Sequence, residues 1–224
     1  MAKLGKVLAA MTDTTPNSAT HFATLCSARR TILPKRLVAP GPDSAQVQQL
    51  LGSAASAPDH GQLLPWRFIV VPAEARGLLA EQFAAALIER DAAALPHQVD
   101  QAREKAFRSP LLMLVVVDAL RGDPAVDLLE RMVSAGCAIQ NLLLMATAQG
   151  YGSALTSGKA LKSGGLRKLF GLAEHDHAVC FVSVGTASTG KPGRERPLPH
   201  DFASHLTVQQ GVVQGLPDNL LESP

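Results

Sequence analysis

An unbroken apolar run at residues 111–117 constrains the fold of this chain more than any other segment. The run reads Leu-Leu-Met-Leu-Val-Val-Val, which is the length of one β-strand and has no polar face. Strands of this kind lie inside a sheet and are covered on both sides. The sequence therefore predicts a central strand with a layer of structure against each of its faces.

Before and after this run, apolar residues recur at the spacing of helices and strands. Further strands are expected at 66–72 and 178–184, with a short strand or loop between 150 and 157. Helices are expected from the caps at Asn17 and Ser18 to near Arg29, from Asp43 or Ser44 to before Pro58, and at 73–94, 98–107, 125–149 and 161–170. The second half of the 125–149 helix is apolar nearly all round, which indicates burial within the fold or between subunits.

The composition favours one globular domain. The chain has 224 residues, 46% of them hydrophobic and 18% charged, with a net charge of +2. The basic residues are scattered, which argues against a nucleic-acid partner, and no segment has the roughly 20 apolar residues of a membrane span. We expect a flexible N-terminal extension at 1–17, a single domain at 18–206 and a C-terminal tail at 207–224.

The three cysteines, Cys26, Cys137 and Cys180, are widely spaced among apolar or small neighbours. Their odd number and spacing are typical of buried free thiols and not of a disulfide framework. The N-terminal residues show no basic end followed by a long apolar core. A reducing, cytoplasmic location is the expectation that follows.

Two basic segments are candidates for binding a phosphate. Arg29-Arg30-Thr31 offers forked guanidinium donors and a hydroxyl where a helix gives way to a loop. Arg194-Glu195-Arg196 would aim both guanidinium groups to one side if it is extended. Each segment by itself is also compatible with a solvated, exposed charge cluster.

Two loops have the composition of ligand walls. Residues 58–66 form a proline-bracketed polar loop that carries His60 and leads into Trp66, the only tryptophan; an exposed turn and a core-packed Trp66 are the alternatives. Gly150-Tyr151-Gly152 follows the long helix and is followed by Thr156-Ser157-Gly158. Glycines and small hydroxyls there allow a planar ligand to approach the main chain.

Several common chemistries have no support in the sequence. The Gly150 turn is not a dinucleotide fingerprint, because Leu155 stands where the third glycine would be. The chain has no Walker lysine motif, G-x-S-x-G elbow, C-x-x-C pair or H-E-x-x-H helix. His175-Asp176-His177 is the one metal-like cluster, and a solvated turn is the favoured interpretation, so no metal site is predicted.

Taken as a set, these motifs resemble the nitroreductase family of FMN-dependent oxidoreductases, especially its compact bacterial branch. That branch has an Arg-Arg-Ser near its start, an Ala-Pro-Asp-His loop leading to Pro-Trp, a Ser-Ala-Gly-Cys-Ala helix and an Ala-Gln-Gly-aromatic-Gly turn. The corresponding residues here are Arg29-Arg30-Thr31, 57–60 with 65–66, 134–138 and 148–152. The resemblance covers roughly residues 22–206 and depends on the order and separation of the motifs.

The resemblance implies an FMN site and its residues. Arg29 and Thr31 would hold the phosphate and ribityl groups, with Arg30 near the ring or phosphate, and His60 would reach a flavin bound mainly by the other subunit. The remaining implied positions are Ser56, Leu155, Thr156, Ser157, Arg194 and Arg196 for the cofactor, and Met145, Ala146, Thr147, Ala148, Gln149 and Gly150 for the nicotinamide donor.

The resemblance also implies a fold and an activity. The fold is an α+β sandwich with a mainly antiparallel central sheet, as an intertwined homodimer with a C-terminal strand near 201–206 that crosses to the partner. The activity is a ping-pong transfer of electrons from NADH or NADPH through FMN to an electron-poor acceptor such as a nitroaromatic or quinone. No amino-acid nucleophile is then required, and no catalytic side chain is predicted.

The sequence departs from the family pattern at positions that bear on the substrate. Leu155 and Thr156 stand where close relatives have Trp-Arg, and Ser56 stands where a relative offers arginine. Other readings stay open: a flavin-binding storage or sensing module without turnover, a different flavin reaction on the same fold such as dehalogenation, or an interaction protein with a decayed pocket.

Overall fold

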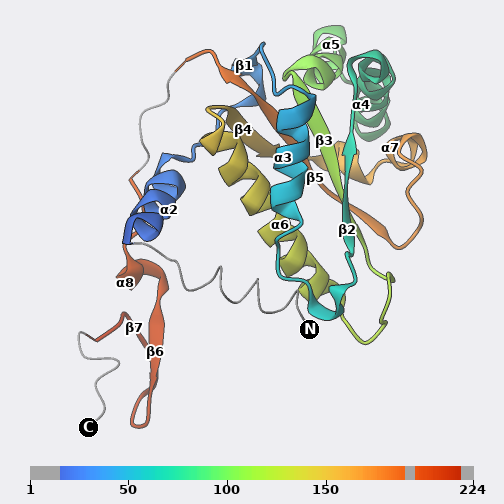
Figure 1. Ribbon diagram of the computed structural model, residues 1–224. Helices are drawn as coiled ribbons and strands as arrows, with labels where there is room; N and C mark the ends of the chain where they lie inside the picture. Colours follow the sequence, from blue (N-terminus) through green and yellow to red (C-terminus); the bar gives the residue numbers. More distant parts are fainter. Residues whose placement is uncertain (1–15, 190–194, 218–224) are drawn as a thin grey trace, which may run out of the picture. The chain divides into compact units, whose positions relative to one another are not determined.

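The central strand β3 (Leu111–Asp118) is the apolar run that dominates the sequence, and it is buried along almost its whole length. In the computed structural model, which describes residues 16–189 and 195–217, β3 runs through the middle of a mixed helix and strand unit (Figure 1). The chain divides into two compact units, Met1–Gly190 and Lys191–Pro224. The predicted domain boundaries at 17 and 206 stay predictions.

Every strand pairing in the central sheet is antiparallel. The other strands are β1 (Leu37–Val38), β2 (Trp66–Val70), β4 (Gly152–Thr156) and β5 (Asp176–Ala187). Strand β3 pairs with β2 on one side and β5 on the other, and β5 also pairs with β4 and β1. The expected antiparallel sheet is confirmed.

Alternate residues of β3 enter two separate cores. Met113 and Val115 belong to one buried cluster, whereas Leu112 and Leu114 belong to the other. This follows from the two-residue period of a strand, since successive side chains point to opposite faces. A strand with only apolar residues is therefore required where both faces are covered.

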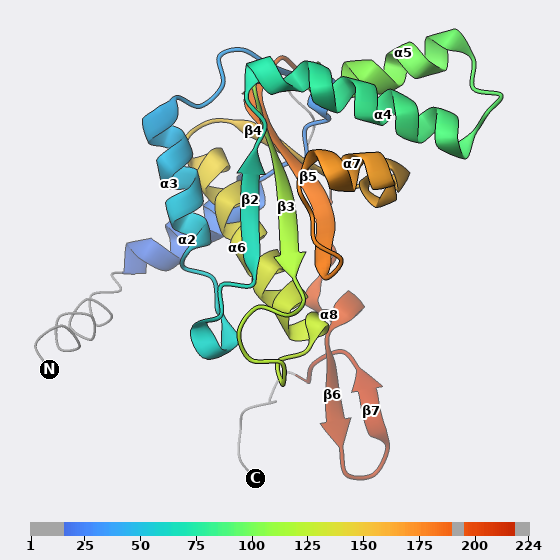
Figure 2. The same cartoon turned by 90° about the vertical axis from the view of Figure 1, so that its right-hand side faces the viewer.

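Helices α3 (Ser44–Ala54) and α6 (Leu128–Ala148) cover one face of the sheet (Figure 2). Asp43 begins α3 with a capping box, in which its carboxylate accepts from the backbone of Gln46 and the Gln46 side chain accepts from the backbone of Asp43. Helix α2 (Pro16–Ala28) also contacts α6.

Helices α4 (Arg76–Arg90), α5 (Pro96–Glu104) and α7 (Gly164–Leu169) cover the opposite face (Figure 2). Leu79 of α4 and Leu166 of α7 are fully buried there, and Phe181 of β5 packs edge-on against Phe83 at 5.6 Å between ring centroids. The layers confirm the α/β/α sandwich.

The second unit is described by itself. It contains a short helix, α8 (Pro199–Phe202), and a hairpin of β6 (Ser204–Thr207) and β7 (Gly211–Gln214). The predicted strand near 201–206 overlaps β6 from Ser204 onward, whereas residues 201–202 belong to α8. Its crossing to a partner stays a prediction. The second strand, β7, was not expected from the sequence.

None of the described helices combines the length and the apolar character that are needed to cross a bilayer.

Candidate functional site

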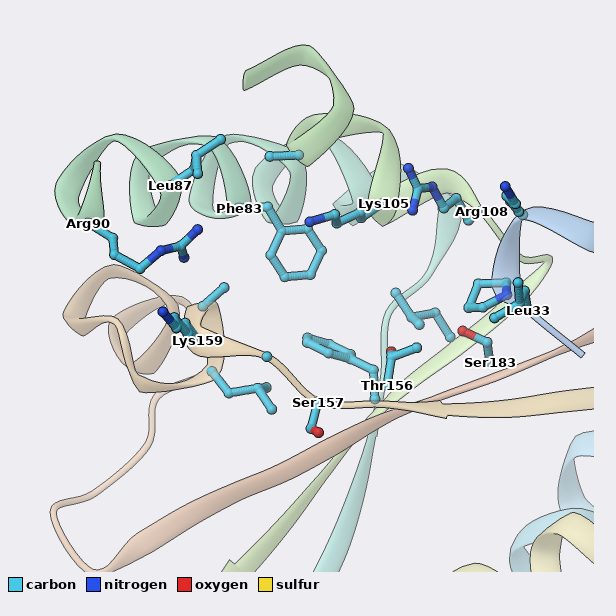
Figure 3. A pocket seen from close by; sticks show the side chains of 18 residues that line it. Leu33, Phe83, Leu87, Arg90, Lys105, Arg108, Thr156, Ser157, Lys159 and Ser183 are labelled. Atoms are coloured by element: carbon cyan, nitrogen blue, oxygen red, sulfur yellow. The ribbon is translucent and has the colours of Figure 1, made fainter. Parts of the chain in front are cut away.

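A cavity of about 620 Å³ lies on the face of the sheet covered by α4, α5 and α7 (Figure 3). Its walls come from the loop after α2, from α4 and the segment after α5, from the end of β4 and from β5. The lining residues that matter below are Lys35, Phe83, Arg90, Lys105, Arg108, Thr156, Ser157, Lys159 and Phe181. This volume is in the range of small-molecule and cofactor sites.

The charge lining the cavity is of one sign. Lys35, Arg90, Lys105, Arg108 and Lys159 contribute five basic side chains, and no acidic residue is among the described residues that line it. Arg108 approaches Glu104 only at 4.0 Å. Walls of low dielectric around charges of one sign concentrate a positive potential, so the cavity favours an anion.

Part of the cavity wall is aromatic and apolar. Phe83 and Phe181 line the cavity together with Leu87 and Leu112, and the two rings meet edge-on at 5.6 Å between centroids. Thr156 and Ser157 add two hydroxyl side chains from the end of β4. A planar group with an anionic substituent fits this combination of surfaces.

Arg76 holds the segment that carries two of the cavity cations. This buried arginine donates to the backbone carbonyls of Val71 at 2.8 Å, Ala106 at 2.6 Å, Ser109 at 3.3 Å and Pro110 at 3.2 Å. Lys105 and Arg108 lie within or beside that segment. A buried guanidinium therefore fixes the chain between α5 and β3, and with it one wall of the cavity.

The basic segment near the N-terminus lies beside β4. Thr31 forms an isolated parallel bridge with Ser153, and the amide of Ile32 donates to the carbonyl of Ser153 at 2.9 Å. Arg30 donates to the carbonyls of Ser27 and Arg29. Thr31 and the predicted ring residue Thr156 are thus brought to one strand, whereas none of residues 29–31 lines the large cavity.

A buried hydroxyl next to this segment has no partner. Among the described residues none donates to or accepts from the Ser153 Oγ atom, although Ser153 is 1% exposed. Buried polar groups are nearly always hydrogen-bonded, so an orphaned hydroxyl is a position where a ligand or water is expected.

The turn after α6 is shaped by packing within the chain. Gly150 has φ +83° and ends the helix in the left-handed conformation. A Cβ added to Gly152 would come within 2.9 Å of Leu37 and 3.0 Å of Ile32. The glycine at 152 therefore permits close approach of the chain's own side chains, and the approach of a planar ligand to this turn stays a prediction.

The residues predicted for the nicotinamide donor occupy the last turn of α6 and its cap. Ala146 is buried, Met145 packs against the core, and Gln149 donates to Gln49 at 2.8 Å and to the carbonyl of Gln46 at 3.4 Å. None of residues 145–150 lines the large cavity. Their role stays a prediction.

His60 lies away from the large cavity. Its Nδ1 atom is 2.6 Å from Glu130 Oε2, and this hydrogen bond raises the pKa of the exposed imidazole. The pair borders a second depression of about 350 Å³ that is also lined by Leu129 and Val133 of α6. The side chain of Leu129 is 75% exposed and that of Val133 68%.

The loop that carries His60 is fixed at its end. Gln62 and Leu64 have backbone φ angles of +53° and +48°, which residues other than glycine seldom adopt. The indole of Trp66 donates to Ser134 at 3.0 Å inside the core beside α6. Trp66 is thus a core residue, and the loop is bound to the helix with the exposed apolar side chains.

The other predicted cofactor residues are dispersed. Ser56 is exposed at the end of α3 and Leu155 is 43% exposed on β4, and neither lines the large cavity. Arg196 belongs to the second unit, which is described by itself, and Arg194 lies outside the described residues.

The metal-like cluster is a structural ion pair. Ligand atoms of Asp118, His175 and Asp176 lie within 4.8 Å of one another. Both carboxylate oxygens of Asp176, however, accept from Arg67, at 2.9 and 2.7 Å. The guanidinium already neutralises this carboxylate, so the arrangement favours a structural role and His177 is simply part of β5.

Sequence reasoning missed all five cavity cations. They are Lys35, Arg90, Lys105, Arg108 and Lys159, which come from four separate places in the chain, and each looks like a solvated surface charge in the sequence. Lys159 follows Thr156-Ser157-Gly158 directly, and this adjacency was the only local signal. The others converge only through the packing of α4 and α5 on the sheet.

An antiparallel α/β/α sandwich with a basic, aromatic-walled cavity at the end of β4 defines a nitroreductase-like protein. The model of the nitroreductase family matches residues 27–186. A Haemophilus influenzae protein named "Putative NAD(P)H nitroreductase" is 36% identical over 176 residues, which is 77% of this chain and 93% of that protein. The chain belongs to the nitroreductase family.

Other comparisons agree. "Putative NAD(P)H nitroreductase YdjA" of Escherichia coli K12 is 37% identical over 153 residues, 67% of this chain and 81% of that protein. A nitroreductase-like protein from Bacillus cereus has a TM-score of 0.69 at 18% identity, over 80% of this chain and 92% of its own. An iodotyrosine deiodinase bound to FMN and 3-iodo-L-tyrosine has a TM-score of 0.60 at 20% identity, over 79% and 95%. At these identities the structures show the fold.

Proposed function

We propose that the protein is an FMN-dependent oxidoreductase that passes electrons from NADH or NADPH to an electron-poor small molecule, such as a nitroaromatic or a quinone, by a ping-pong mechanism. The cavity of about 620 Å³ with basic side chains and aromatic walls is the observation that carries the proposal. The names of the relatives, which specify NAD(P)H, and the FMN in the deiodinase structure support it.

The residues present fit the cofactor. Its isoalloxazine ring needs an apolar surface, which Phe83 and Phe181 offer, and its ribityl hydroxyls need partners such as Thr156 and Ser157 in the same cavity. The unpartnered Ser153 hydroxyl lies on the same strand as Thr156 but outside the cavity lining. Its phosphate needs arginine and hydroxyl donors of the kind that Arg29 and Thr31 provide next to β4.

The proposed tasks of the chain's own residues are to bind FMN, to orient its ring and to neutralise negative charge. We propose that Arg29, Arg30 and Thr31, with Arg194 and Arg196, hold the phosphate, while 155–157 and Ser56 lie along the ring and 145–150 serve the donor. Of those that the structure describes, Thr156 and Ser157 line the cavity and the others lie outside its lining. FMN supplies the two-electron chemistry when it is bound. Lys105 and Arg108 then lower the cost of negative charge inside the cavity, because preorganised cations act strongly where water is excluded.

We further propose a homodimer with His60 directed to the partner's site. The exposed apolar side chains of Leu129 and Val133 on α6 lie beside His60 and support an interface there. In the second unit Leu206 and Val212 are also largely exposed, 79% and 73%, as expected of a hairpin that packs on a partner. A cytoplasmic location agrees with the three free cysteines.

A spectroscopic experiment tests the proposal. The purified protein, supplied with FMN, should show flavin absorbance that NADH or NADPH bleaches without oxygen and that a nitroaromatic or menadione then restores. A yellow protein that neither nicotinamide bleaches would favour the flavin storage or sensing module. A protein that does not retain added FMN would refute both flavin hypotheses.

A further inference from the structure

Two cations in the cavity have no assigned task in the proposed function. Arg90 is the last residue of α4, and Lys159 is the first residue of the short 3₁₀ helix η5 (Lys159–Lys162). Both line the cavity, and in Figure 3 both lie toward the end that is away from Arg108. Helix α4 contacts η5, so the two side chains come from adjoining elements.

Neither cation is neutralised within the part of the chain that the structure describes. No described hydrogen bond or ion pair involves the side chain of Arg90 or of Lys159. Asp91 follows Arg90 but lies outside the cavity lining, and its carboxylate instead accepts from the backbone amide of Ala93 at 3.1 Å. Two exposed cations that line one cavity without a described counter-ion favour an anionic ligand.

The walls between these cations and the rest of the cavity restrict the shape of that ligand. Phe83 and Leu87 line the cavity from the same helix as Arg90, and Leu161 lines it from the same 3₁₀ helix as Lys159. An aromatic ring can rest on these apolar surfaces while a carboxylate on the ring reaches the guanidinium and the ammonium group.

From these contacts we propose that Arg90 and Lys159 form a carboxylate-binding subsite, and that the preferred electron acceptors are aromatic molecules with a carboxylate. The inference rests on the proposed function and names the acceptor class of the same site. The proposed function assigns the cofactor phosphate to Arg29 and its neighbours, which lie outside the cavity lining, so Arg90 and Lys159 are available to the acceptor.

The test compares 4-nitrobenzoate with 4-nitrobenzamide, which is its uncharged counterpart. Binding of each compound to the FMN-loaded protein, without any nicotinamide, is measured by calorimetry. The wild type should bind 4-nitrobenzoate at least about tenfold more tightly, since a charged hydrogen bond is worth about 1.5–3 kcal/mol. Arg90→Ala and Lys159→Ala should each remove most of that preference, and Arg90→Glu should reverse it.

Lys162→Ala is the matched control, because Lys162 is an exposed lysine of the same 3₁₀ helix outside the cavity lining. It should keep the wild-type preference. Flavin content and melting temperature are measured for each variant, and Arg90→Gln and Lys159→Gln replace any alanine variant that fails to fold.

Three results would overturn the inference. The first is equal binding of the two compounds by the wild type, and the second is a preference that survives both alanine substitutions. The third comes from separate half-reactions: if Arg90→Ala slows bleaching by NADPH but leaves the acceptor preference intact, the cations serve the phosphate of the donor. A protein that retains no FMN, or that no nicotinamide bleaches, instead refutes the proposed function itself.

Discussion

The guanidinium of Arg67 on β2 and the carboxylate of Asp176 on β5 form a two-pronged ion pair across β3, with N to O distances of 2.9 and 2.7 Å. Asp176 is 4% exposed. Arg67→Ala leaves a buried carboxylate without its main partner, so we expect a loss of about 2–3 kcal/mol in the free energy of unfolding. Urea unfolding measures this free energy. Arg121→Ala is the control, because Arg121 is an exposed arginine whose one described acceptor is a backbone carbonyl.

The same pair predicts a pH dependence of stability. The hydrogen bond from Arg67 lowers the pKa of Asp176 from its ordinary value of 3.8, against the opposing effect of burial. A lowered pKa contributes stability that is fully present above 3.8 and is lost as the pH falls through the pKa of the folded state. Asp176→Asn should therefore be destabilising near neutral pH, and its effect should shrink as the pH falls below 3.8 toward the pKa of the folded state. An effect that is independent of pH would contradict the assignment.

Arg76 is expected to support both stability and cofactor binding. Arg76→Ala leaves the carbonyls of 106–110 without their donor, which should cost about 2–4 kcal/mol in the free energy of unfolding. Because this segment positions Lys105, the affinity for FMN should fall as well, and Arg76→Lys should restore only part of it. Arg103→Ala is the control. Arg103 lies on α5, and its partners are the exposed carboxylates of Glu81 on α4 and Asp100 on α5.

Val133→Asp should disrupt the proposed dimer without unfolding the protomer. The side chain is 68% exposed, so the new charge is costly only when a partner covers it. Light scattering after gel filtration should show at least tenfold weaker association. Leu78→Asp places the same charge at a side chain that is 62% exposed on α4, in the opposite helix layer, and should stay dimeric. If Val133→Asp also stays dimeric, α6 does not form the interface.

The three thiols should differ in reactivity. Burial raises the pKa of Cys180 to about 11, whereas Cys26 and Cys137 are half-buried. At about pH 8 only about one part in a thousand of Cys180 is thiolate, so iodoacetamide should leave it unmodified in the folded protein. Mass spectrometry after treatment in urea should find all three modified. Rapid native modification of Cys180 would show that the β5 strand opens readily.

Arg29→Ala should weaken retention of FMN by about ten- to a hundredfold, because each charged hydrogen bond to a phosphate contributes about 1.5–3 kcal/mol. Equilibrium dialysis measures the affinity. Arg36→Ala removes an exposed arginine from the 3₁₀ helix that follows and should bind FMN like the wild type. An unchanged affinity in Arg29→Ala would refute the role of this residue.

Local patterns in the sequence were sufficient to predict most of the helices and strands of the first unit. Residues 111–117 are apolar at every position because both faces of β3 are covered. Asp43 marks the start of α3 because it is the N-cap residue of a capping box. Both signals depend only on neighbouring residues. The family motifs added the antiparallel topology, which periodicity alone does not specify.

The remaining features depend on contacts between distant residues. His60 and Glu130 are 70 positions apart, and the two-residue strand β1 is too short for any periodic signal. Arg76 is charged and so resembles a surface residue, yet it is buried because four carbonyls converge on it. The cavity cations likewise meet only after α4 and α5 fold onto the sheet.

Alternate side chains of β3 enter different cores, so the two helix layers can change independently in evolution. Met113 and Val115 support the layer with the exposed face of α6, whereas Leu112 and Leu114 support the layer with the cavity. Substitutions in α4, α5 and η5 can therefore alter ligand preference while the opposite layer keeps its packing. A lineage of such proteins can diversify its substrates while the exposed face of α6, where we propose that two copies assemble, stays unchanged.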